Sequence, residues 1–167
     1  MSGVTTPRDE VDDLVDAWRR ERPDLDVDPM EVLSRISRLA RHLERARSAA
    51  FSRHDLEGWE FDVLAALRRA GAPYRLSPGR LLKETGVTSG TMTNRVDRLA
   101  ARDLVTRDDD PSDRRGVLVV LTPAGRTTVD AALADLLLAE ASILGPLAAS
   151  ERDQLARSLR GLLAPYA

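Results

Sequence analysis

Hydrophobic residues recur at helical spacing in the first part of the chain and predict three helices. The first covers residues 9–21, and the second starts at Pro29 and carries an apolar stripe as far as Ala46. The third covers about residues 57–70, and Gly71 is placed to end it in a left-handed conformation. The apolar residues of these faces are Val11, Leu14, Val15 and Trp18, then Leu33, Ile36, Leu39, Ala40, Leu43 and Ala46, then Phe61, Leu64, Ala65 and Leu67.

Two short helices joined by a tight turn follow in the middle of the chain. Ser77 with Pro78 is a helix start, and Gly86 closes this helix after about residue 84. Thr88 then caps another helix almost at once. A pair of helices separated by a few residues that include a glycine is the helix-turn-helix layout.

The hydrophobic period changes after this pair and predicts a hairpin. Residues 104–107 and 116–121 alternate like strands, and the polar segment DDDPSDRR separates them. Thr122 starts a long helix that runs to about residue 144, and Ser150 with Asp153 caps a last helix. The order predicts a mainly α fold, an α+β winged helix-turn-helix with a two-stranded β wing.

The helix after Thr88 has one apolar side and one polar side. Met92, Val96 and Leu99 point inward, whereas the outward side is rich in Thr, Ser and Gly instead of the Glu and Lys pairs of an ordinary solvated face. Hydroxyl, amide and guanidinium groups suit base edges and phosphates. The candidate contacts to double-stranded DNA in this region are Ser77, Thr88, Ser89, Thr91, Thr93, Asn94 and Arg98.

The hairpin supplies a second set of candidate DNA contacts. Asp113 can orient Arg115, while Arg114 and Arg115 project from the hairpin toward a minor groove, whose negative potential attracts arginine. The aspartates at 108–110 would repel phosphate, so we expect them to point away from DNA.

The outer helices carry more Leu and Ala than one small lobe can bury. We therefore expect a helical homodimer, although packing on their own monomer is an alternative. The expected organisation is an extra N-terminal helix at 1–28, a long helix of the dimer region at 29–56, the DNA-binding lobe at 57–122 and dimerisation helices at 123–167.

Composition narrows the classes of protein. The 167 residues include no cysteine, which excludes disulfides, thiolate metal sites and thiol-based redox sensing. No apolar run is long enough to span a bilayer and the N-terminus does not resemble a signal peptide, so we expect a cytoplasmic protein without a membrane partner.

Charge is distributed unevenly along the chain. The net charge is −2, but residues 75–126 hold ten basic and seven acidic side chains, so the basic part coincides with the predicted DNA-binding segment. Only Lys83 among the 25 basic residues is a lysine. Arginine suits phosphate and guanine recognition, although a compositional bias of the genome explains this preference equally well.

The run TSGTMTNRVDRLAARDLVTRDDDPSDRRGVLVVLTPAGR resembles the multiple antibiotic resistance regulator (MarR) family of bacterial repressors. The helical order extends the resemblance over nearly the whole chain, and the D-x-R wing followed by LTPAGR is its most specific part. The resemblance implies homodimers on pseudo-palindromic operators, with recognition helices in major grooves and wing arginines in minor grooves. Arg115 matches the wing arginine.

Arg95 and Asp62 lie at the edges of buried faces. A carboxylate there needs a partner, and Arg95 or Arg107 is the candidate. The chain also resembles a branch of the family that has an extra N-terminal helix and responds to urate. The resemblance implies that Trp18, Asp62, Arg95 and Arg107 hold a small anionic effector, with some relatives using citrate or aconitate instead. A purely structural salt bridge, with Trp18 anchoring the first helix, is the alternative.

Two other functions compete with a ligand-responsive repressor. A ligand-insensitive winged-helix or architectural protein would bind DNA and ignore such anions. An enzyme would need convergent chemistry that the sequence lacks, since His42 and His54 are the only histidines and read as lone surface residues. We therefore expect no catalytic site, metal site or cofactor.

Overall fold

The computed structural model describes residues 7–111 and 113–166, with the backbone alone over 113–115. The chain divides into two compact units, Met1–Arg45 and Ala46–Ala167. None of the helices in the described ranges is long and apolar enough to cross a membrane.

The first unit contains α1 (Glu10–Glu21) and most of α2 (Pro29–Ser52). Asp9 caps α1, because its carboxylate accepts the backbone N–H of Val11 at 2.8 Å. The apolar core of this unit is small and consists of Val11, Val15 and Val27, with Met30 packed against it.

Ion pairs join α1 to α2 within the first unit. The guanidinium of Arg35 donates to Asp9 at 2.9 and 3.0 Å, to Asp12 at 2.8 Å and to Glu31 at 2.7 Å. The bond from Arg35 lowers the pKa of Asp9 below its ordinary value. Arg35 is thus the centre of a charged network that crosses from α2 to the start of α1.

The second unit is built around α3 (Gly58–Arg69), α4 (Pro78–Thr85) and α5 (Ser89–Ala100). The predicted turn chemistry is present: the Ser77 hydroxyl accepts the N–H of Arg80 at 3.3 Å, and Gly86 ends α4 at φ +67°. The predicted helix-turn-helix is confirmed. Its core joins all three helices to α6 and the sheet through Phe51, Leu64, Leu67, Leu81, Met92, Leu99, Val105, Val119 and Val129.

A three-stranded antiparallel sheet flanks the helices, with strand order β1-β3-β2. β2 (Val105–Asp110) and β3 (Asp113–Leu121) form the wing, and β1 (Arg75–Leu76) pairs with the base of β3. Both wing strands are longer than predicted. The acidic run lies inside β2 and not in a loop, because hairpin pairing satisfies its backbone while Asp108 and Asp109 stay exposed.

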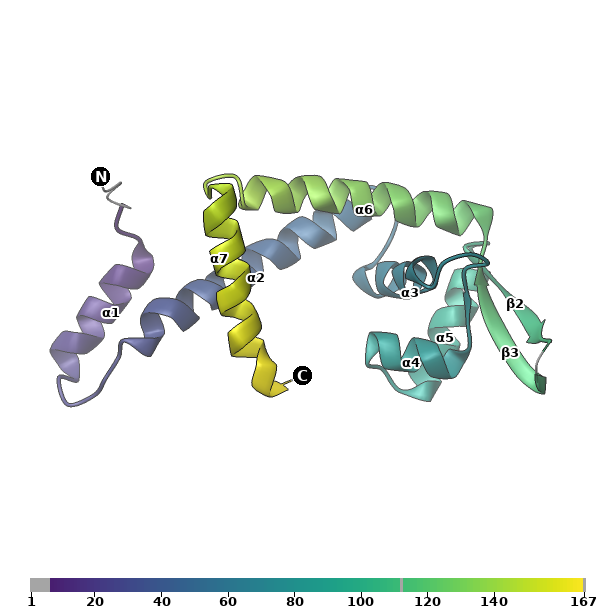
Figure 1. Cartoon of the computed structure of the whole chain (residues 1–167), viewed down its shortest axis with the longest axis horizontal. Coiled ribbons are helices and arrows are strands. Elements are labelled where there is room, and N and C mark those ends of the chain that lie inside the picture. The colour runs from purple at the N-terminus through teal and green to yellow at the C-terminus, as the bar shows by residue number, and fades with distance from the viewer. Residues whose placement is uncertain (1–6, 112, 167) are drawn as a thin grey trace. The chain divides into compact units, whose positions relative to one another are not determined.

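α6 (Pro123–Ile143) begins against the wing and packs on α3 (Figure 1). The Thr122 hydroxyl accepts the N–H of Gly125 at 2.9 Å, as the predicted cap requires. Gly125 lies so close to the chain that a Cβ on it would stand 2.0 Å from the carbonyl oxygen of Leu104. The wing and α6 therefore meet in a contact that only glycine permits.

The last helices are mostly exposed. α7 (Ala149–Leu163) buries no side chain in the part of the chain that the structure describes, and η1 (Ala164–Tyr166) follows it. α7 begins two residues earlier than the predicted Ser150 cap implies. Its cap is Ala148, whose N–H donates to the Glu151 carboxylate at 2.7 Å, because Glu151 reaches back to the helix start.

Candidate nucleic-acid interface and effector site

α5 presents a polar face to solvent. Met92, Val96 and Leu99 are buried against the lobe, as predicted, while Asn94 and Arg98 are exposed on the other side. The inward stripe fixes the rotation of the helix about its axis. The polar face is thereby held outward on a rigid support.

The hydroxyls at the start of α5 are held by local bonds. Thr88 Oγ1 lies 3.0 Å from Thr91 Oγ1, and the Thr93 hydroxyl donates to the Ser89 carbonyl at 3.2 Å. All four residues are exposed, whereas Ser77 is half-buried at the start of α4. These hydroxyls are therefore preorganised at one end of the exposed face.

The wing candidates Asp113, Arg114 and Arg115 lie in β3, but their side chains are outside the described part of the chain. Their predicted contacts with DNA stay predictions.

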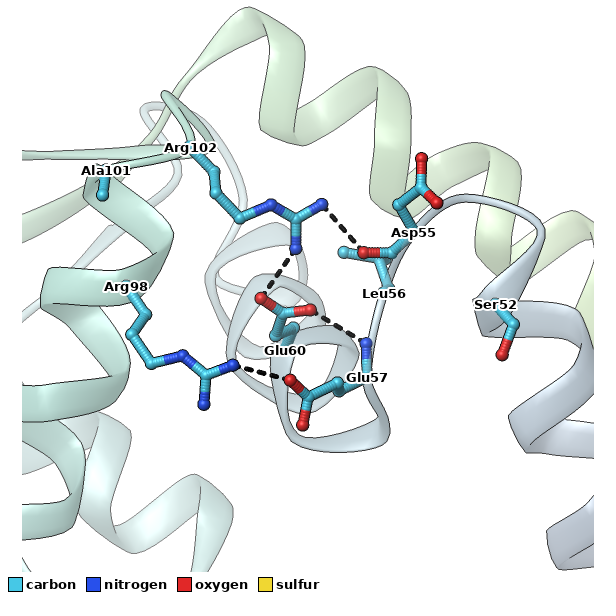
Figure 2. A pocket seen from close by; sticks show the side chains of 8 residues that line it. All are labelled: Ser52, Asp55, Leu56, Glu57, Glu60, Arg98, Ala101 and Arg102. Carbon is cyan, nitrogen blue, oxygen red and sulfur yellow. Dashed lines mark hydrogen bonds and ion pairs between the residues drawn. The ribbon is translucent and has the colours of Figure 1, made fainter.

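Arg98 is held by the start of α3. Its Nη2 donates to Glu57 Oε1 at 2.6 Å (Figure 2). Its guanidinium carbon lies 4.7 Å from the ring centre of Trp59. The Trp59 indole donates to Glu57 Oε2 at 2.8 Å. The Trp59 bond first, and the Arg98 bond second, lower the pKa of Glu57 below its ordinary value. Sequence reasoning did not identify Glu57 and Trp59.

A second ion pair lies beside the first, and both line an open pocket of about 500 Å³. Arg102 Nη1 donates to Glu60 Oε1 at 2.7 Å, and its Nη2 donates to the Asp55 carbonyl at 2.8 Å (Figure 2). Glu60 is only 2% exposed, and its other oxygen accepts the Glu57 N–H at 2.8 Å. Arg98 of α5 and Arg102, just beyond its end, thus meet two carboxylates at the start of α3.

The structure corrects the expected partner of Asp62. This carboxylate is half-exposed and pairs with Arg47 at 3.7 Å, not with Arg95 or Arg107. Arg95 lies instead with its guanidinium 5.3 Å from the Trp59 ring centre. Asp62 turns toward α2 because it follows the buried Phe61 by one residue, on the α2 side of α3.

Arg107 lies in a separate pocket of about 380 Å³ between α5 and the sheet. Its Nη1 is 2.6 Å from Asp97, and Met92, Val96 and Val119 also line the pocket. The fourth effector candidate, Trp18, belongs to the first unit and is 44% exposed.

Both histidines have polar neighbours: His42 Nδ1 lies 3.3 Å from Arg45 Nη2. His54 is a partner in a bond to Asp135, with Nε2 and the carboxylate oxygen 3.1 Å apart, so it is not the lone surface residue we expected. Its position at the end of α2, facing α6, explains the difference. No group of three or more potential metal ligands occurs among the described residues.

An exposed polar helix, a supporting helix and a flanking hairpin together define a winged helix-turn-helix protein. The family model for the MarR family matches residues 54–116. The transcriptional regulator PecS of Dickeya dadantii is 40% identical over 152 residues, which is 91% of each chain. The chain therefore belongs to the MarR family of DNA-binding transcriptional regulators.

Two solved structures extend the comparison to operator DNA and to regulation by a small molecule. A variant of MarR from E. coli in complex with operator DNA matches 83% of this chain and 99% of that chain, with 27% identity and a TM-score of 0.67. Bordetella bronchiseptica BpsR, whose DNA binding is regulated by 6-hydroxynicotinic acid, matches 77% of this chain and 98% of that chain, with 32% identity and a TM-score of 0.58.

Proposed function

We propose that two copies of this chain repress transcription from a pseudo-palindromic operator and leave it when a small anionic effector binds. The observation that carries the proposal is the exposed polar face of α5 above the buried Met92, Val96 and Leu99. A helix held in this way can enter a major groove while its support stays folded.

The exposed polar groups of α5 would contact the bases and the flanking phosphates. Its first turn brings the hydroxyls of Thr88, Ser89, Thr91 and Thr93, and Asn94 supplies an amide. Arg115 in β3 would reach the adjacent minor groove, as in the family it resembles.

The exposed apolar residues of the last helices support a homodimer. Leu137 is 54% exposed, Leu138 71% and Leu163 64%, and burying such residues on a second copy is favourable. Two copies would then present two recognition helices to the two half-sites of the operator.

The arginines of the lobe support an anionic effector. Arg107 pairs with Asp97 in its pocket, and Arg95 stacks on Trp59, so an anion can bind either guanidinium by displacing Asp97 or the Trp59 ring. We propose urate, or citrate or aconitate, as the effector; the predicted roles of Trp18 and Asp62 in binding it stay predictions. Because 6-hydroxynicotinic acid regulates DNA binding by BpsR, 6-hydroxynicotinate should be tested as well.

Fluorescence anisotropy of a labelled duplex from upstream of the chain's own gene tests the proposal. At fixed physiological salt, one of these four anions should release the bound protein. Arg95→Ala should retain DNA binding and lose the response. Arg126→Ala is the matched control, since Arg126 stacks on Tyr74 outside the proposed site.

Tight binding that ignores all four anions would overturn the effector assignment and favour a ligand-insensitive winged-helix protein. No salt-dependent binding to any DNA would overturn the whole proposal.

A further inference from the structure

Arg98 belongs to the row of α5 that the proposed function brings to DNA. Thr91, Asn94 and Arg98 follow one another at intervals of three and four residues, and all three are exposed. Arg98 is 52% exposed, so its guanidinium is within reach of an approaching phosphate or guanine edge.

In the free protein this guanidinium already has an anionic partner. One oxygen of the Glu57 carboxylate accepts Arg98 at 2.6 Å, and the other accepts the Trp59 indole at 2.8 Å. Trp59 also covers the Arg98 guanidinium with its ring. Glu57 and Trp59 together hold the Arg98 side chain against the start of α3.

The inference rests on the proposed function: we propose that Glu57 sets the affinity for DNA by competing with it for Arg98. A carboxylate and a phosphate make the same kind of charge-assisted bond with a guanidinium, so Arg98 has to leave one to bind the other. The released Glu57 carboxylate then stands near DNA phosphates and repels them. Both effects weaken binding.

The neighbouring pair shows why Glu57, and not Glu60, is the competitor. Glu60 is 2% exposed and its partner Arg102 is also bonded to the Asp55 carbonyl, so the Glu60 carboxylate is inaccessible to DNA and its pair with Arg102 helps to hold the end of α5 in place. Glu57 is 58% exposed, and its pair with Arg98 can open without unfolding any element. Figure 2 shows the two pairs side by side.

Glu57→Gln tests the proposal because it removes the charge and keeps an oxygen for Trp59. The probes are the labelled upstream duplex and sonicated DNA of mixed sequence, titrated over a range of salt. Glu57→Gln should bind the duplex about two- to fivefold more tightly, as expected for an exposed ion pair. The slope of the logarithm of its binding constant against the logarithm of the salt concentration should become steeper by up to about 0.9, because one more cation is free to pair with a phosphate.

A double-mutant cycle shows whether the gain acts through Arg98. In an Arg98→Ala background, Glu57→Gln should give a smaller gain, because only the repulsion between Glu57 and the DNA phosphates is left to remove. Glu84→Gln is the matched control: it makes the same charge change on α4, where the carboxylate pairs with Arg69. An unchanged urea midpoint shows that the variants are folded.

The outcomes separate the two proposals. Unchanged or weaker binding by Glu57→Gln, a gain that is equally large without Arg98, or an equal gain from Glu84→Gln would overturn the role of Glu57. Failure of the unmodified protein to bind either DNA at low salt would overturn the proposed function, and this inference with it.

Discussion

Different forces stabilise each of the two units of the molecule internally. The second unit buries Leu64, Leu67 and Leu99 completely in one core that joins helices to sheet. The first unit buries three valines and surrounds them with ion pairs centred on Arg35. Apolar burial is insensitive to salt and pH, whereas exposed ion pairs respond to both. The first unit should therefore loosen under conditions that leave the second intact.

The largest expected effect comes from the core of the second unit. Leu64→Ala should lower the free energy of unfolding by about 2–5 kcal/mol, because it leaves a cavity among fully buried side chains. Urea unfolding followed by far-UV circular dichroism measures it. Val15→Ala, at an equally buried position of the first unit, should mainly speed hydrogen exchange in α1. A loss as large as that of Leu64→Ala would show that the units unfold together.

The ion pairs around Arg35 should stabilise α1 without changing the stability of the second unit. Arg35→Met should speed hydrogen exchange of the α1 amides severalfold and leave the urea midpoint of the lobe unchanged, because three carboxylates lose their shared cation. Arg41→Met is the matched control, since the described part of the chain gives Arg41 no ion pair. Equal exchange in both variants would contradict a stabilising role for the network.

Acidification should produce the smallest of these changes in stability. The pKa of Asp9 is lowered in the folded chain by Arg35, so its stabilising contribution is complete above the ordinary value near 4 and is lost as the pH falls through the lower folded value. In a Trp59→Phe background, iodide quenching of Trp18 should rise below about pH 4. Adding Asp9→Asn should flatten that rise; an identical profile would assign the transition to other groups.

Much of the fold could be predicted because its signals are local. Ser77, Gly86 and Thr122 mark helix ends through their own backbone and side-chain bonds. The strand β1 has no such signal, since two residues become a strand only by pairing with β3 far along the chain. The wing was predicted too short because the aspartates of β2 look like a loop until pairing is known.

The residues of the candidate site could be predicted from the sequence, but the side chains with which they pair could not. The outward side of α5 follows from the stripe of Met92, Val96 and Leu99. The partners of Arg98 and Asp62 depend on how α3 packs against α5 and α2, which no periodicity encodes. The spacing of Glu57 and Glu60, typical of a helix start, was the one available signal for the carboxylates that meet α5.

The contact between Gly125 and Leu104 has a mechanical consequence. A Cβ on Gly125 would lie only 2.0 Å from a backbone oxygen, so the first turn of α6 and the base of the hairpin pack with no space between them. We therefore expect the first turn of α6 and the base of the hairpin to move together, so that a tilt of α6 also displaces the wing.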